Sequence, residues 1–143
     1  MLIEKGFLLL VKNKKMSIFT KIIKGEIPSY KVAENEKFYA FLDINPNAKG
    51  HTLVVPKKEV NKLFDLDEET YNELMIFSRK IAIAIEKVVP CKRIGMSIIG
   101  LEVPHVHVHL IPLQAMEDIQ FIKKVKLQPK EFEAIAKSIS EKL

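Results

Sequence analysis

Three of the four histidines occupy alternate positions in the segment 104–112, which begins and ends with proline. They are His105, His107 and His109. Such alternation is typical of a β-strand, because successive side chains of a strand point to opposite faces. We therefore expect Val106, Val108 and Leu110 in the core and the three imidazoles in a row on the other face. Side chains two positions apart on a strand are roughly 7 Å apart, so the row could span a small charged group.

Two kinds of chemistry are open to such a row of imidazoles. Imidazole is a good ligand for Zn, Cu, Fe and Ni, although the only acid beside the row is Glu102, across a proline. Alternatively, the row could act on a phosphate group. A neutral imidazole is a nucleophile toward phosphorus, and its neighbours could donate hydrogen bonds to the phosphate oxygens. The chain has no Walker motif and no carboxylate cluster, which fits a reaction that uses neither a glycine-rich loop nor Mg²⁺.

Hydrophobic periodicity predicts the elements that would hold these side chains. We expect strands over 31–34, 37–42, 51–56 and 94–99, in addition to the histidine strand. A short helix is expected over 17–25, a long one that starts within 65–69 and runs to about 89, and an amphipathic one over 129–143. Asp43 ends one strand, and the fourth histidine, His51, begins the next. An acidic residue at the end of a strand often contacts a ligand or caps a turn.

Composition and charge limit the class of protein. The chain has 143 residues, 48% of them hydrophobic and 29% charged, as expected for one globular domain. The single cysteine, Cys91, excludes an internal disulfide and is compatible with a reducing cytoplasm. The net charge of +5 comes from the two ends, since residues 1–15 and 121–143 each carry +3 and residues 16–120 carry −1. We therefore expect no nucleic-acid partner.

The first residues are set apart from the rest. The apolar run 7–11 is too short to span a membrane, and its flanking charges differ from those of a signal peptide. We expect 1–15 to be an N-terminal extension without function, such as an upstream start codon would add. The expected domain is 16–143, without a membrane partner.

The histidine segment 105–111 resembles the motif of the histidine triad (HIT) superfamily. The segments 17–28, 41–46 and 50–58 are similar to the Hint branch of that superfamily, in the same order. The resemblance covers about residues 16–113. It implies an α+β fold with an antiparallel β-sheet, one long helix and shorter terminal helices. It also implies a homodimer with the strand before the triad near the dimer interface.

The resemblance implies a reaction and a role for each polar site residue. HIT enzymes of this kind release a purine nucleoside monophosphate from a phosphoramidate or adenylyl conjugate through a nucleotidyl-histidine. His107 would be the nucleophile, His105 and His51 would orient it, and His109 would contact the phosphate. Asp43 would accept hydrogen bonds from the ribose hydroxyls.

An apolar slot for the base is implied by the same resemblance. It would consist of Ile18, Phe19, Ile22, Ile27, Phe41 and Ile44. Neither a cofactor nor a metal is implied, and a cytoplasmic location is expected. Two alternatives remain open: hydrolysis of dinucleoside polyphosphates, and nucleotide binding with little turnover.

The segment before the triad departs from the pattern of Hint relatives. Leu101 stands where those relatives have glutamine, and Glu102 where they have serine or threonine. An anionic Glu102 beside a phosphate would be repelled by it. Either Glu102 points into solvent, or it serves as a proton donor or as a partner for a cationic leaving group such as an amine.

Overall fold

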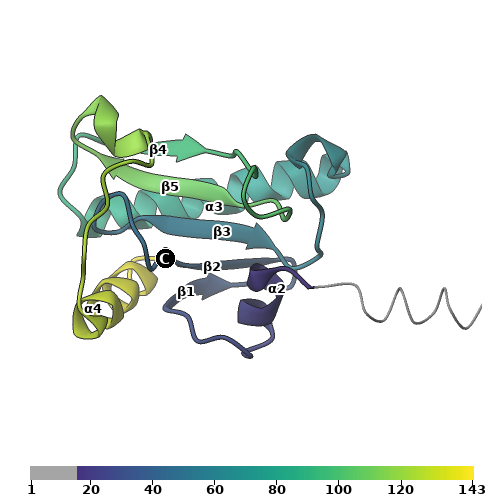
Figure 1. The fold of residues 1–143 in the computed structure, drawn as a ribbon, viewed down its shortest axis with the longest axis horizontal. Helices are drawn as coiled ribbons and strands as arrows, with labels where there is room; N and C mark the ends of the chain where they lie inside the picture. Colours follow the sequence, from purple (N-terminus) through teal and green to yellow (C-terminus); the bar gives the residue numbers. More distant parts are fainter. Residues whose placement is uncertain (1–15) are drawn as a thin grey trace, which may run out of the picture.

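The computed structural model describes residues 16–143; the expected extension 1–15 lies outside the described residues. Five strands form one antiparallel sheet in the order β1-β2-β3-β5-β4 (Figure 1). They are β1 (Lys31–Glu34), β2 (Phe38–Leu42), β3 (Thr52–Pro56), β4 (Arg93–Ser97) and β5 (Val108–Leu113). The α+β class and the antiparallel sheet expected from the sequence are confirmed.

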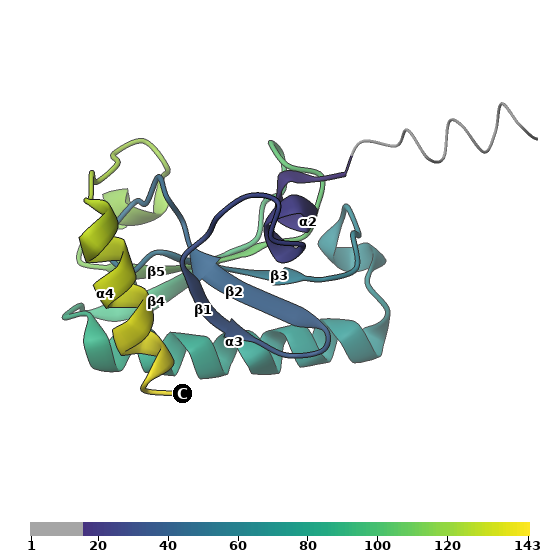
Figure 2. The same cartoon turned by 90° about the horizontal axis from the view of Figure 1, so that it is seen from below.

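Helices cover the two faces of the sheet unequally. The long helix α3 (Glu68–Val88) runs along one face, and the short helix α2 (Ile18–Ile23) lies on the opposite face (Figure 2). The C-terminal helix α4 (Pro129–Ser140) packs against α3, β1 and β2. Two single 3-10 turns, Leu63–Asp65 and Met116–Ile119, lie in the connections. No helix within 16–143 combines the length and the apolar character that crossing a membrane requires.

Helix ends follow the capping residues in the sequence. Ser17 caps α2 by accepting a hydrogen bond from the amide of Thr20, and Asp67 caps α3 in the same way through Thr70. Pro129 occupies the first turn of α4, where a missing amide hydrogen costs nothing.

The alternation of side chains along the strands separates two apolar clusters. The larger cluster lies between the sheet and helices α3 and α4, and includes Val54, Val108 and Leu110. The smaller cluster lies on the α2 side of the sheet and includes Phe41 and Leu53. In β2, β3 and β5 the odd-numbered residues therefore point toward α2. Every polar residue expected at the site is also odd-numbered, except Glu102 in the loop before the triad.

The expected strand over the histidine segment was only partly correct. Strand β5 begins at Val108; His105 lies in a bend, and 106–107 precede the strand without a ladder partner. The neighbouring strand β4 ends at Ser97, so it cannot pair with this part of the chain. The amide of Val106 instead donates to the carbonyl of Val60, 2.8 Å away. All three histidines are nevertheless buried, as are Val106 and Val108.

Candidate active site

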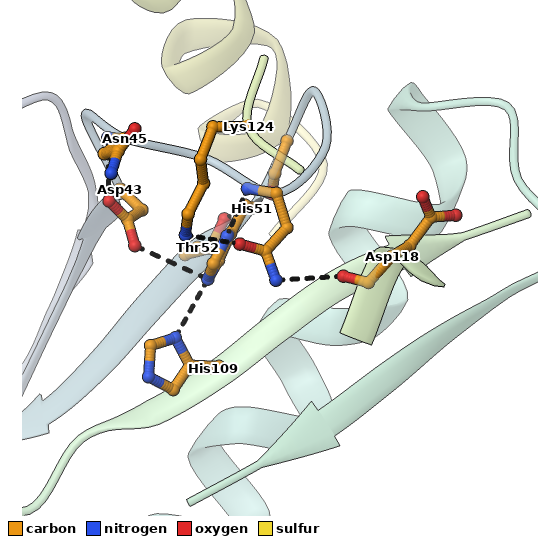
Figure 3. A network of polar contacts seen from close by, with 9 residues as sticks. Asp43, Asn45, His51, Thr52, His109, Asp118 and Lys124 are labelled. Carbon is orange, nitrogen blue, oxygen red and sulfur yellow. Dashed lines mark hydrogen bonds and ion pairs between the residues drawn. The ribbon is translucent and has the colours of Figure 1, made fainter. Parts of the chain in front are cut away.

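Three adjacent strands bring Asp43, His51 and His109 together (Figure 3). Asp43 directly follows β2 and donates its amide to the carbonyl of His51, which directly precedes β3. His109 lies in β5 opposite Leu53, two residues beyond His51. His51 Nε2 is 2.9 Å from His109 Nδ1 and 3.6 Å from Asp43 Oδ2. The sheet register itself therefore places these three side chains in contact.

Gly50 sets the direction of the backbone just before His51. Its φ of +93° lies in the left-handed region that glycine tolerates best. A Cβ at this position would lie 2.8 Å from the side chain of Val89 and 3.3 Å from that of Pro112. Both the conformation and the close packing therefore require glycine here.

The hydrogen bonds of His51 determine where its proton lies. The amide of Asn47 donates to His51 Nδ1 over 3.0 Å, so this nitrogen accepts. Neutral His51 then carries its proton on Nε2 and donates it to His109 Nδ1. Neutral His109 in turn carries its proton on Nε2. This proton is available to donate to a phosphate oxygen.

The same reasoning places the protons of His105 and His107. His107 Nδ1 lies 2.7 Å from the carbonyl oxygen of His105, and His105 Nε2 lies 2.7 Å from that of Pro56. Carbonyl oxygens only accept, so both ring nitrogens donate. His107 Nε2 is left with a free lone pair when the ring is neutral, which is the form that a nucleophile needs.

Burial keeps the four imidazoles neutral. It lowers the pKa of His51 and of His109 to about 3, with smaller contributions from neighbouring positive charge. Burial also lowers the pKa of His105 and His107. For His107 the hydrogen bond to the His105 carbonyl and the negative charges of Asp43 and Glu102 oppose this effect. Burial raises the pKa of Asp43.

Most of the expected apolar slot lies beside the triad. The ring of Phe19 contacts those of His107 and His105, with centroids 4.8 and 5.7 Å apart. Phe19, Ile22 and Phe41 are buried in the α2-side cluster, against which Ile27 packs. Ile18 is 48% exposed and Ile44 is 72% exposed, so these two side chains lie at the surface.

The connection after β5 contributes residues that sequence reasoning missed. Lys124 Nζ donates to Asn47 Oδ1 over 2.6 Å, and Asn47 Nδ2 donates to the carbonyl of Asp118 (Figure 3). The positive charge of Lys124 contributes to lowering the pKa of His51 and His109, and it opposes the rise that burial causes in the pKa of Asp43. The ring of Phe121 packs edge-on against that of His109, 4.7 Å away. No motif or periodicity marks this connection.

The residues that depart from the Hint pattern lie at the surface. Leu101 is 89% exposed, and Glu102 is also exposed. Although Glu102 faces solvent, its negative charge acts on His107 and favours the protonated form of that ring.

Asp43, His51 and His109 could also hold a metal ion, because their ligand atoms lie within 4.8 Å of one another. Hydrogen bonding accounts for this arrangement without an ion, since His51 and His109 already share a proton. The positive charge near them from Lys124 opposes a bound cation.

Comparisons with known proteins agree with this geometry. The HIT domain family model matches residues 24–116. Adenosine 5'-monophosphoramidase HNT1 of Saccharomyces cerevisiae is 44% identical over 96 residues, which are 66% of this chain and 61% of that protein. Adenosine 5'-monophosphoramidase hnt1 of Schizosaccharomyces pombe is 36% identical over 130 residues, covering 88% of this chain and 97% of that protein.

Solved structures show the same fold. A crystal structure of a Hit-like protein from Bartonella henselae, described as involved in cell-cycle regulation, matches with a TM-score of 0.77 and 35% identity. The match covers 89% of this chain and 96% of that one. With the family model, the relatives and the fold in agreement, this chain belongs to the HIT family.

Proposed function

We propose that this protein is a nucleotide hydrolase or transferase that releases a purine nucleoside monophosphate from phosphoramidate or adenylyl conjugates. The observation that carries the proposal is the 2.7 Å contact between His107 Nδ1 and the His105 carbonyl oxygen, which places the ring proton on Nδ1 and leaves Nε2 unprotonated. The phosphoramidase activity named for two relatives supports the same class of substrate.

The reaction would proceed in two displacements at phosphorus. His107 Nε2 forms a bond to phosphorus, while the bond to the leaving amine breaks and the amine takes up a proton from solvent. Water then attacks phosphorus, releases a proton to solvent and displaces His107, which gives the nucleoside monophosphate. His109 Nε2 would donate a hydrogen bond to the phosphate oxygen on which charge develops. His51 and His105 would hold the rings in place.

Substrate binding would use the residues around the triad. Asp43 would accept hydrogen bonds from the ribose hydroxyls, and its position 3.6 Å from His51 Nε2 supports this role. Phe19, Ile22, Ile27 and Phe41 would contact the base from the α2 side of the sheet. Ile18 and Ile44 would close over the base from the surface, because both are exposed.

Glu102 would favour an amine as the leaving group. Its negative charge acts on His107 and would attract a cationic amine but repel a phosphate. We expect Glu102→Gln to lower the ratio of amine release to phosphate release. An unchanged ratio would remove Glu102 from the account of leaving-group choice.

The reaction class is tested by comparing an adenosine phosphoramidate with a dinucleoside polyphosphate. We expect faster AMP release from the phosphoramidate, and loss of that release in His107→Ala. Preference for the polyphosphate would favour a dinucleoside polyphosphate hydrolase. AMP binding without release from either substrate would favour a nucleotide-binding protein with little turnover.

The protein would act as a homodimer in the cytoplasm. Strand β4 is one of the two edge strands of the sheet, and Met96 on it is 53% exposed, as expected for an edge that another subunit covers. Analytical ultracentrifugation should give a dimer, which Met96→Lys should weaken; a monomeric wild type would contradict it. The cytoplasmic location is a prediction from the single cysteine, Cys91.

A further inference from the structure

A second polar cluster lies at the start of α2, against the ring of His105. Ser17 Oγ is 2.6 Å from His105 Nδ1. Glu59 Oε1 lies 2.6 Å from the amide of Ser17 and 2.8 Å from Thr20 Oγ1. Ser17, Thr20 and Glu59 are half-buried, whereas His105 is fully buried. None of the three belongs to the histidine triad or to the expected apolar slot.

The hydrogen bonds of this cluster can run in one direction only. The Glu59 carboxylate accepts, so both the Ser17 amide and the Thr20 hydroxyl donate to it. Ser17 Oγ accepts from the amide of Thr20 over 3.0 Å. Because His105 Nε2 donates to the Pro56 carbonyl, neutral His105 must accept at Nδ1. The Ser17 hydroxyl proton is the one it accepts, in the shortest contact that this hydroxyl makes.

His105 connects this cluster to the nucleophile. Its carbonyl oxygen is the acceptor that holds the proton on His107 Nδ1, 2.7 Å away. Its ring is fixed at both nitrogens, by Ser17 on one side and by Pro56 on the other. Phe19, which follows directly after the first residue of α2, packs against both imidazoles. A shift of α2 or of the His105 ring would therefore be transmitted to His107.

Glu59 fixes the first turn of α2 to the segment that follows β3. The hydrogen bonds from the Ser17 amide and from the Thr20 hydroxyl lower the pKa of Glu59. Glu59 is therefore ionised at neutral pH. The next residue, Val60, accepts the amide of Val106, between the two histidines. Glu59 and Val60 thus hold both helix α2 and the backbone of the histidine triad.

We propose that Ser17 and Glu59 are positioning residues for the His107 reaction. Ser17 holds His105 in the tautomer that is protonated on Nε2, and Glu59 holds Ser17. Neither residue touches the substrate. The proposal rests on the proposed function for its kinetic effect, but the tautomer of His105 can be measured without any activity.

The experiment compares Ser17 variants by kinetics and by ¹⁵N NMR of the imidazole nitrogens. In wild type, His105 should show a protonated Nε2 and an unprotonated, hydrogen-bonded Nδ1. Ser17→Ala should change the Nδ1 signal and lower kcat for AMP release by about three- to tenfold, with KM within about twofold. Ser17→Thr, which keeps the hydroxyl, should restore both.

Four further variants separate positioning from general destabilisation. Ser17→Gly removes the hydroxyl but retains most of the helix cap, so it should repeat the kcat loss of Ser17→Ala if Ser17→Ala folds poorly. Glu59→Ala should lower kcat, and Glu59→Gln should recover part of it because the amide oxygen still accepts. Ser29→Ala is the matched control, since Ser29 is another half-buried serine, 3.0 Å from the Tyr39 hydroxyl, and should leave kcat unchanged.

Two results would overturn the proposal. One is an unchanged Nδ1 signal and unchanged kcat in Ser17→Ala and Ser17→Gly. The other is an equal loss of kcat in Ser29→Ala, which would indicate general destabilisation. If wild type releases no AMP, the proposed function fails, and the NMR comparison alone then decides the role of Ser17.

Discussion

His107 is suited to nucleophilic attack because its two ring nitrogens have different surroundings. Nδ1 is tied to a backbone carbonyl, and this bond fixes the proton there. Burial lowers the pKa of the ring, so Nε2 remains unprotonated below the usual pKa of histidine. The carboxylates of Asp43 and Glu102 act in the opposite direction. The pH below which His107 Nε2 becomes protonated thus depends on the opposing effects of burial and of the neighbouring charges.

Replacing Glu102 should shift that balance. The negative charge of Glu102 raises the pKa of His107, so Glu102→Gln should lower it. The acid limb of the pH profile of kcat/KM for AMP release should therefore move to lower pH. Glu117→Gln is the control, because Glu117 is an exposed carboxylate 3.7 Å from Lys123. A limb that stays in place, or moves to higher pH, would mean that Glu102 does not act on the nucleophile.

At the scale of elements, the sheet determines which residues meet. Asp43, His51 and His109 come from three neighbouring strands and share one face because all three are odd-numbered in the register of the sheet. The backbone turn at Gly50 then fixes the position of His51. The strands and this turn therefore set the distance between the His51 and His109 rings.

Gly50→Ala should destabilise the protein more than Gly25→Ala. Both glycines have positive φ, +93° at Gly50 and +79° at Gly25, but an added Cβ would clash with Val89 only at Gly50. We expect a loss of about 1–3 kcal/mol from the conformation alone, and a further loss at Gly50 from the clash. Urea unfolding of both variants measures the difference. Equal losses would show that the close approach at Gly50 relaxes at no cost.

The sequence predicted those elements whose periodicity is strong. The long helix was expected to about 89 and ends at Val88, and the strands over 31–34 and 51–56 agree within one residue with β1 and β3. The histidine strand was expected over 104–112 but begins only at Val108, because the alternation of residue types continues where the backbone no longer pairs with a neighbouring strand.

Contacts made by irregular segments could not be predicted in the same way. Lys124 approaches Asn47 because the connection after β5 folds back, with the amide of Val125 donating to the Pro46 carbonyl. Neither helical nor strand periodicity marks such a contact. Ser17 has a local role as the cap of α2, but its contact with His105 joins residues 88 positions apart. When a side chain has both a local role and a long-range contact, the sequence reveals only the local role.

At the scale of the whole molecule, the buried histidines make folding sensitive to acid. His51 and His109 have a pKa of about 3 in the folded protein, against about 6.5 when unfolded. Below about pH 6.5 the unfolded chain therefore binds protons that the folded chain does not. This contribution to stability is fully present above that pH and decreases as the pH falls toward 3.

The free energy of unfolding should therefore fall between pH 6.5 and 5, by up to about 1.4 kcal/mol per pH unit for each of these two histidines. His109→Gln removes one titrating group and should make the slope shallower. Urea unfolding at several pH values between 6.5 and 5 measures this slope in both proteins. The paired carboxylates, such as Glu59 and Asp118, have lowered pKa values and act at more acidic pH. A stability that does not change between pH 6.5 and 5 would contradict the neutral, buried state of the pair.

Trapping the covalent intermediate tests the central role of His107 most directly. The protein is mixed with an adenosine phosphoramidate, quenched in alkali because phosphorus–nitrogen bonds to histidine hydrolyse in acid, and analysed by mass spectrometry. We predict an adduct of the mass of an adenylyl group on the peptide that contains His107. The adduct should be absent from His107→Ala and formed normally by Ser29→Ala. Full AMP release without any adduct, or an adduct that persists in His107→Ala, would contradict nucleophilic attack by His107.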